Sequence, residues 1–188
     1  YELENKAVSY ELVIVGYGSE YHYLTNALDS EISSGKVILT GYLSAKDIKI
    51  ELDKSDIFIL LSDFEGMPLS LVEAMAHGCV TVVRQMNSGI PELVENGVNG
   101  KVIHADSYRD WAEEIAKLSS NISSLCEYSK NAKEKVLNGF TVESSVDGFI
   151  LGLHSVLEKK ASITRPRPLT WNSTCGDFKI PHALMDQK

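Results

Sequence analysis

Short apolar runs alternate with helix-like periodicities along the first hundred residues. Continuous apolar runs rich in β-branched residues are typical of parallel strands that helices cover on both faces. Helical patterns separate these runs, as in a chain of β-α-β units. The pattern therefore predicts an α/β fold with a doubly wound parallel sheet. Its five strands are expected at 11–15, 36–40, 56–61, 79–83 and 101–103.

Helix boundaries support this division of the chain. Ser44 and Ser107 each begin a four-residue stretch that ends in aspartate, a pattern typical of a helix N-terminal cap. Gly78 stands where a helix should end. Beyond residue 103 the strand signal stops and the C-terminal part reads as helical. Three helices are predicted there, at about 107–120, 122–137 and 142–159.

The chain divides into a domain at 1–160 and an extended tail at 161–188. The tail holds three of the five prolines and shows no period. We expect it to dock on the domain through Trp171 and Phe178. Residues 1–10 resemble the end of a helix that leads straight into a strand, so we expect the first strand of the domain to lie upstream.

Charge and composition exclude several classes of function. The formal net charge of −8 would repel nucleic acid and anionic lipid. No apolar run approaches the ~18 residues of a membrane span, and the first residues do not resemble a signal peptide. The three cysteines are odd in number and widely spaced, which disfavours a disulfide framework or a metal site. Reduced thiols indicate a cytoplasmic protein.

Glycines follow the first predicted strand, where a parallel sheet binds its ligands. Gly16 and Gly18 could begin a dinucleotide fingerprint, but Tyr21 occupies the position of its third glycine. The second strand also ends without the acidic residue that would hold a ribose. A tight turn between strand and helix explains these glycines better than a NAD site.

A more informative stretch, residues 65–78, reads EGMPLSLVEAMAHG. Pro68 suits a first helical turn, which predicts a helix at about 69–77. Glu73 would then lie on a largely apolar helix and need a partner, either a core cation such as Arg84 or a ligand. Glu65 would lie in the preceding loop. Between the glutamates, a helix start suited to phosphate exposes the amides of Gly66, Met67, Leu69 and Ser70.

Two acceptor groups on either side of a phosphate cradle suit a sugar nucleotide. Together with VGYGSE, LTGYLS and GIPELVENGVNG, the stretch at 65–78 resembles the C-terminal, donor-binding domain of the retaining glycosyltransferases of family four, or glycosyl transferases group 1. The resemblance covers roughly residues 10–160 and implies the GT-B fold. Its most specific mark is the pair of glutamates, Glu65 and Glu73, in this context.

The resemblance implies a donor site for a nucleoside-diphosphate sugar. Glu65, the catalytic candidate, would bond hydroxyls of the transferred sugar, and Glu73 would hold the ribose. The resemblance implies neither a protein nucleophile, a cofactor nor a metal. The remaining donor-binding positions would be the amides of Gly66, Met67, Leu69 and Ser70 at the sugar and diphosphate, Leu43 and Tyr42 near the base, and Gly16 and Gly18 along the cleft.

The chain departs from the family pattern at its start. Family members open this domain with a strand and loop that supply an arginine and a lysine for the diphosphate, and an acceptor-binding N-terminal domain precedes it. We therefore expect this chain to transfer no sugar alone, and any peripheral membrane contact to involve the upstream domain. The alternatives are a sugar-nucleotide epimerase or phosphorylase on the same fold, or a non-catalytic nucleotide-binding module.

Overall fold

The computed structural model describes residues 2–104 and 107–158, which belong to two compact units. The first unit comprises residues 1–146, and the second comprises residues 147–188. The described residues of the second unit, 147–158, lie in helix α9 (Val142–Glu158). The predicted tail at 161–188, with Trp171 and Phe178, lies outside the described residues.

All five predicted strands are present, each within about a residue of its expected bounds. Neighbouring strands pair in parallel in every case. The α/β prediction is therefore confirmed. The strands are β1 (Leu12–Val15), β2 (Val37–Gly41), β3 (Ile57–Leu60), β4 (Val80–Arg84) and β5 (Gly100–Ile103).

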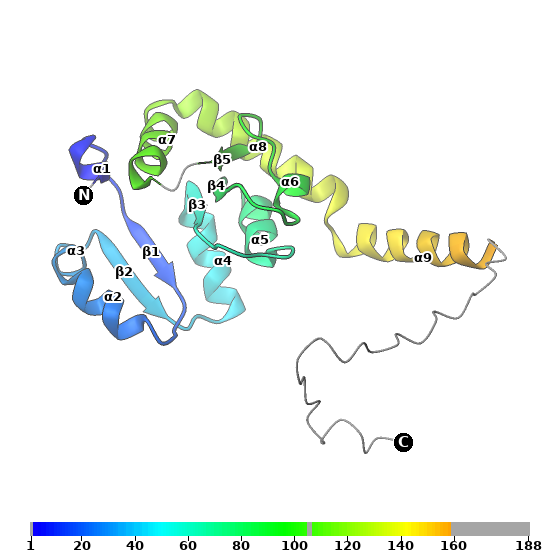
Figure 1. Cartoon of the computed structure of the whole chain (residues 1–188), viewed down its shortest axis with the longest axis horizontal. Coiled ribbons are helices and arrows are strands. Elements are labelled where there is room, and N and C mark those ends of the chain that lie inside the picture. Colours follow the sequence, from blue (N-terminus) through cyan, green and yellow to red (C-terminus); the bar gives the residue numbers. More distant parts are fainter. Residues whose placement is uncertain (1, 105–106, 159–188) are drawn as a thin grey trace, which may run out of the picture. The chain divides into compact units, whose positions relative to one another are not determined.

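The described strands form two sheets rather than one continuous sheet. One sheet has the order β1-β2 and the other the order β3-β4-β5 (Figure 1). Strands β1 and β3 therefore each have an edge that is paired with no described strand. The general doubly wound sheet has the strand order 3-2-1-4-5-6, in which its central strand 1 separates the pair 3-2 from the group 4-5-6. A division into two strands and three strands therefore fits this fold class.

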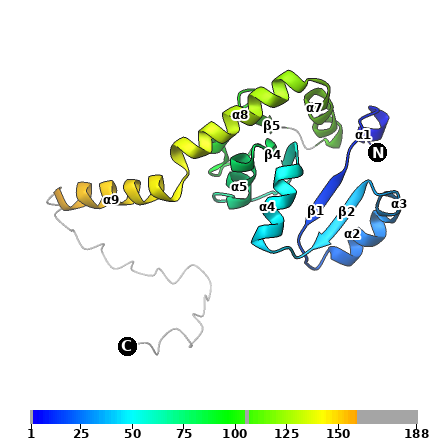
Figure 2. The same ribbon diagram turned by 180° about the vertical axis from the view of Figure 1, so that it is seen from behind.

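Helices connect the strands at the predicted places, and α2 and α3 lie beside β2 in both ribbon views (Figure 2). Ser44 Oγ accepts a hydrogen bond from Asp47 N (3.3 Å), as a capping serine should. Ser107 Oγ accepts instead from Arg109 N (3.3 Å). The helices are α1 (Glu2–Asn5), α2 (Tyr21–Ala27), α3 (Asp29–Ser33), α4 (Ala45–Lys54), α5 (Leu69–His77), α6 (Ile90–Leu93), α7 (Tyr108–Ser120), α8 (Ile122–Gly139) and α9.

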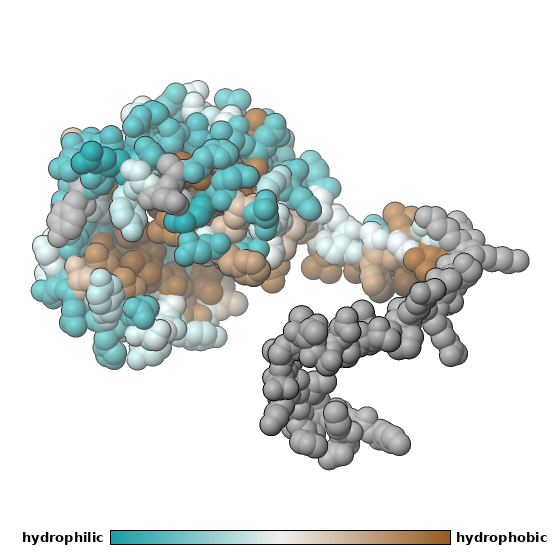
Figure 3. Space-filling view, in the orientation of Figure 1, coloured by the Kyte–Doolittle hydropathy of each residue, from teal (hydrophilic) through white to brown (hydrophobic). Residues whose placement is uncertain are grey.

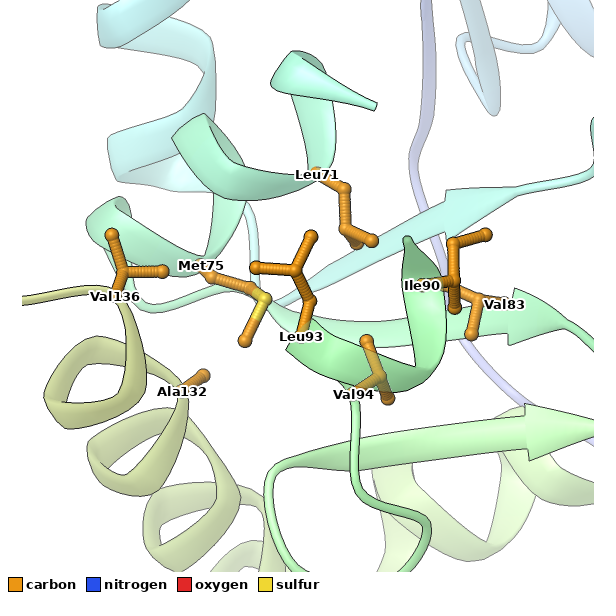
Figure 4. Close-up of a cluster of buried hydrophobic side chains, with 8 residues drawn as sticks. All are labelled: Leu71, Met75, Val83, Ile90, Leu93, Val94, Ala132 and Val136. Atoms are coloured by element: carbon orange, nitrogen blue, oxygen red, sulfur yellow. The ribbon is translucent and has the colours of Figure 1, made fainter. Parts of the chain in front are cut away.

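The three-stranded sheet is buried on both faces, with β4 at its centre. On one face, a cluster packs around Val80 and Val82 and includes Trp111 of α7. Figure 4 shows the cluster on the opposite face, where side chains from α5, β4, α6 and α8 meet. Its members are Leu71, Met75, Val83, Ile90, Leu93, Val94, Ala132 and Val136.

Helix α5 is held firmly by this cluster and ends at a tight glycine turn. Leu71, Ala74 and Met75 are fully buried. Gly78 has φ +87°, and a Cβ there would lie 2.5 Å from Lys133 Cε. The predicted helix stop at Gly78 is therefore confirmed. Among the described residues, no helix has the length and apolar character needed to cross a membrane.

Cys79, directly after this turn, should be chemically inert in the folded protein. Burial raises the pKa of its thiol to about 11, so roughly a hundredfold fewer thiolates are present at neutral pH than for an unperturbed cysteine. Cys126 is exposed. In a Cys175→Ala background, we expect alkylation at pH 8 to modify Cys126 at least about tenfold faster than Cys79, measured by mass spectrometry. Equal rates in the native protein, rather than only in urea, would contradict the structure.

Candidate functional site

The loops at the carboxyl ends of the strands come together in two pairs. In the two-stranded sheet, Gly16 N donates to Gly41 O (2.8 Å), joining the loops after β1 and β2. In the other sheet, Gly89 N donates to Gly66 O (2.6 Å), joining the loops after β3 and β4. The predicted site residues are thus distributed over two loop pairs, one on each sheet.

The loop pair after β3 and β4 contains the start of α5. Helix α5 begins at Leu69, as predicted, and Pro68 precedes it with a buried ring. The first bonds of the helix run from Leu71 N and Val72 N to Pro68 O. Because Leu69 N and Ser70 N precede these bonds, they have no intrahelical acceptor, and both residues are exposed. This end of the helix can accept an anion.

Glu73 is exposed, so the expectation that it is desolvated and needs a partner is wrong. At 100° per residue it lies about 200° around the helix from Leu71, which points into the core. Arg84, the cation considered as its partner, donates from Nη1 to Asp63 Oδ1 (2.8 Å). Within the described residues, no ion pair or hydrogen bond reaches the Glu73 carboxylate. A solvent-facing carboxylate on a fixed helix is available to a ligand.

Glu65 lies at the other end of the same segment, in the loop before α5. It is half-buried, while Gly66 and Met67 beside it are exposed. Asp63, two residues earlier, is 86% exposed and brings the Arg84 guanidinium to this loop. The segment therefore presents carboxylates before and after an exposed row of N–H groups.

The loop pair after β1 and β2 contains the other predicted residues. A cavity of about 210 Å³ is lined by Gly16, Tyr17 and Gly18 with neighbouring residues of β1 and α2. Gly16 has φ +132°, a conformation that only glycine adopts without strain. In the joined loop Leu43 is half-buried, and Tyr42 is 87% exposed. Glu65 and Glu73 do not line this cavity.

The histidines form no metal site within the described residues. His77 Nδ1 lies 2.7 Å from Asp53 Oδ1, an interaction that ties α5 to α4. His22 and His104 are exposed. In the part of the chain that the structure describes, no three His, Cys, Asp or Glu residues are grouped to hold a metal ion.

Sequence reasoning missed Gly89. Its backbone bond to Gly66 joins residues that are 23 positions apart, and no periodicity marks such a contact. The available signal was its place immediately before Ile90 and Pro91, because proline is favoured in the first turn of a helix and glycine is accepted at the N-cap.

Comparison with known proteins places this architecture among glycosyltransferases. The family model described as glycosyl transferases group 1 matches residues 2–136. The putative colanic acid biosynthesis glycosyltransferase WcaL of Escherichia coli K12 is 32% identical over 146 residues, which are 74% of this chain and 36% of WcaL. The amylovoran biosynthesis glycosyltransferase AmsK of Erwinia amylovora is 33% identical over 144 residues, which are 73% of this chain and 35% of AmsK. The chain spans about a third of the length of these relatives.

Solved structures show the same fold. TarM superposes with a TM-score of 0.70 at 23% identity, covering 79% of this chain and 30% of TarM. Anabaena Alr3699/HepE, crystallised in complex with UDP, superposes with a TM-score of 0.67 at 23% identity. The superposition covers 78% of this chain and 41% of the HepE chain. The likeness confirms a GT-B type of α/β domain.

The exposure of Glu73 predicts that its removal leaves stability nearly unchanged. We expect Glu73→Ala to shift the free energy of unfolding by less than about 0.5 kcal/mol, as for an ordinary surface site. Met75→Ala, two residues further along the helix but fully buried, should cost about 2–5 kcal/mol. Urea denaturation of both variants measures the difference. A loss above about 1 kcal/mol for Glu73→Ala would show that the carboxylate has a structural partner.

Proposed function

Because the chain belongs to the glycosyl transferases group 1 family, we propose that it forms the donor-binding half of a retaining glycosyltransferase. The whole protein would move a sugar from a nucleoside-diphosphate sugar to an acceptor. The relatives named for colanic acid and amylovoran biosynthesis support a role in making polysaccharide, glycolipid or another glycoconjugate. The structure of HepE with UDP supports a nucleotide donor.

The observation that carries this proposal is the exposed start of α5 between two available carboxylates. A diphosphate would accept hydrogen bonds from the N–H groups of Gly66, Met67, Leu69 and Ser70, where the helix dipole also favours negative charge. Glu73, one turn along the helix, would accept from the ribose hydroxyls. Glu65, ahead of the helix, would accept from hydroxyls of the transferred sugar.

The other loop pair would receive the nucleoside end of the donor. Leu43 would pack against the base, with Tyr42 beside it. Gly16 and Gly18, which lack side chains, would let the donor approach the backbone of the loop after β1 closely. The joining bond between Gly16 N and Gly41 O supports this assignment, since it holds the two loops side by side.

Positioning and charge would perform most of the catalysis. As the bond between sugar and phosphate breaks, negative charge grows on the leaving diphosphate, and preorganised N–H groups stabilise it without rearranging. Glu65 would hold the sugar so that the acceptor attacks from the face that the diphosphate leaves. No protein nucleophile, cofactor or metal ion is assigned in this proposal. We place the reaction in the cytoplasm, with any contact to the inner face of a membrane made by the upstream domain.

We further propose that a strand from an upstream segment completes the sheet between β1 and β3. The doubly wound order 3-2-1-4-5-6 matches β2-β1 and β3-β4-β5 on either side of a central strand. Helix α1 leads directly into β1, and a strand ahead of it would form a right-handed β-α-β unit beside β1. The acceptor-binding domain would precede that strand, which agrees with the greater length of the relatives.

Side-chain exposure supports this central position. Strand β4, which has a neighbour on each side, is fully buried from Val80 to Val83. Every residue of β3 is only half-buried, although its sequence is entirely apolar. In β1, Leu12 is 36% and Val15 43% exposed. Figure 3 shows hydrophobic residues at the surface in the area that β1 and β3 occupy in Figure 1.

Two backbone hydrogen bonds show which amides face the open edges. Leu12 N donates to Lys36 O (2.8 Å), so Leu12 faces β2, and the amide of the next residue, Val13, faces the open edge. Val80 N donates to Asp56 O (2.9 Å), so Asp56 faces β4. By the same alternation, the amides at 57 and 59 face the open edge of β3, and the amide at 58 faces β4.

The two glutamates should have separable effects on donor binding in the longer protein that includes the upstream segment. Glu73→Ala should weaken binding of both the bare nucleoside diphosphate and the sugar nucleotide. Glu65→Ala should spare the diphosphate and weaken only sugar-nucleotide binding or turnover. Each loss should be about tenfold to a hundredfold, the value of a hydrogen bond to a charged group.

Calorimetry with both ligands measures these four affinities, and product analysis separates sugar transfer from epimerisation or phosphorolysis. Glu92→Ala, an exposed carboxylate on α6, serves as the matched control. Equal loss of diphosphate affinity in both variants would contradict the assignment of the two roles.

The central strand predicts a specific pattern of amide hydrogen exchange. In the longer protein, the amides of Val13, Ile57 and Ile59 should be protected as strongly as those of Leu12 and Phe58. In the 188-residue chain these three should exchange at least about a hundredfold faster, because they lack a partner. Residue-resolved NMR measures the rates. If the three amides exchange rapidly in the longer protein, the upstream strand does not lie between β1 and β3.

A further inference from the structure

Gly89 contacts the donor loop at two points. Its N–H donates to Gly66 O at 2.6 Å. Its missing side chain leaves room for Met67: a Cβ on Gly89 would lie 2.6 Å from Met67 Cε, 2.9 Å from Met67 Sδ and 3.1 Å from Gly66 O. A Cβ at position 89 would therefore force the end of the Met67 side chain to move, and the Gly66 carbonyl oxygen would have to shift by a few tenths of an ångström.

Gly89 is itself fixed by the core. It is the N-cap of α6, and Ile90 and Leu93 of that short helix are buried in the cluster around Met75. Ser88 Oγ accepts from Ile90 N (3.1 Å), which further fixes the turn. The glycine therefore connects a rigid, buried element with the segment at 65–68, in which Gly66 and Met67 are exposed.

The direction of one peptide group follows from this bond. In a planar trans peptide, the carbonyl and the next N–H point in opposite directions. With Gly66 O turned toward Gly89, the N–H of Met67 points away from the loop after β4. In the part of the chain that the structure describes, this N–H forms no hydrogen bond, so it remains available to an outside acceptor.

We infer that Gly89 is a positioning residue of the donor site, and this inference rests on the proposed function. Its N–H sets the orientation of the Gly66–Met67 peptide, and its lack of a side chain allows that peptide to approach. The Met67 N–H is thereby aimed at an oxygen of the bound diphosphate. Gly89 acts through the loop and does not itself touch the ligand.

Gly89→Ala in the longer protein tests this inference. We expect the substitution to move the ¹³C-methyl resonance of Met67 and to weaken binding of the bare nucleoside diphosphate about tenfold or more. The methyl of buried Met75 is the internal reference, and the Met67 signal is identified by its loss in Met67→Ala. The matched control is Gly139→Ala, where no atom lies within 4 Å of the added Cβ.

A double-variant cycle separates the steric effect from a general loss of stability. Removing the Met67 side chain relieves the two closest contacts, so Gly89→Ala should weaken diphosphate binding less in a Met67→Ala background. If Gly89→Ala alone is too unstable to assay, this comparison still decides, because the double variant should fold and bind better than the single one. A double variant that binds no better would overturn the inference.

The outcomes also distinguish this inference from the proposed function. If Glu73→Ala weakens diphosphate binding but Gly89→Ala leaves both binding and the Met67 methyl unchanged, the positioning role is wrong and the proposed function stands. If the Met67 methyl moves while diphosphate affinity is unchanged in both variants, the loop contact is real, but the donor site is elsewhere. That result would overturn both the inference and the proposed function.

Discussion

The packing of α5 against β4 and α6 is the interaction on which the rest of the structure depends. Leu71 and Met75 lie fully buried against Ile90, Leu93 and Val83. Burying side chains of this size contributes about 1.5–3 kcal/mol each, and their close fit leaves α5 one position relative to the sheet. The N–H groups at the start of α5 are therefore held in place by the buried side chains of Leu71 and Met75 on the inner face of the helix. Hydrophobic packing thus fixes the position of the N–H groups that a ligand would meet.

Most of the fold could be predicted because buried parallel strands have a simple signature. The run at 79–83 is apolar except for Thr81 because both of its faces meet helices, and the structure places β4 at Val80–Arg84 in that environment. The start of α5 was predictable because proline is favoured at a helix start, and its end because only glycine readily adopts φ +87°. These signals are local, so a single sequence contains them.

The rest depends on contacts between distant residues. Glu73 has apolar neighbours in sequence, but the helix turns them inward and leaves the carboxylate in solvent. Burial predicted from neighbours in sequence was therefore wrong for this residue. The division of the sheet depends on which strands pair, and apolar runs do not specify partners. The contact of Gly89 with Gly66 arises only when β3 and β4 lie side by side.

The open edges of β1 and β3 have a consequence for how the chain behaves in isolation. Natural proteins protect edge strands with lysine, proline, bulges or a covering segment. The strand sequences LVIV and IFIL contain neither charge nor proline, as suits the interior of a sheet. An exposed apolar strand with unpaired N–H and C=O groups is a template for strands of other molecules. With these edges uncovered the domain would therefore tend to aggregate, and its solubility would depend on the segment that covers them.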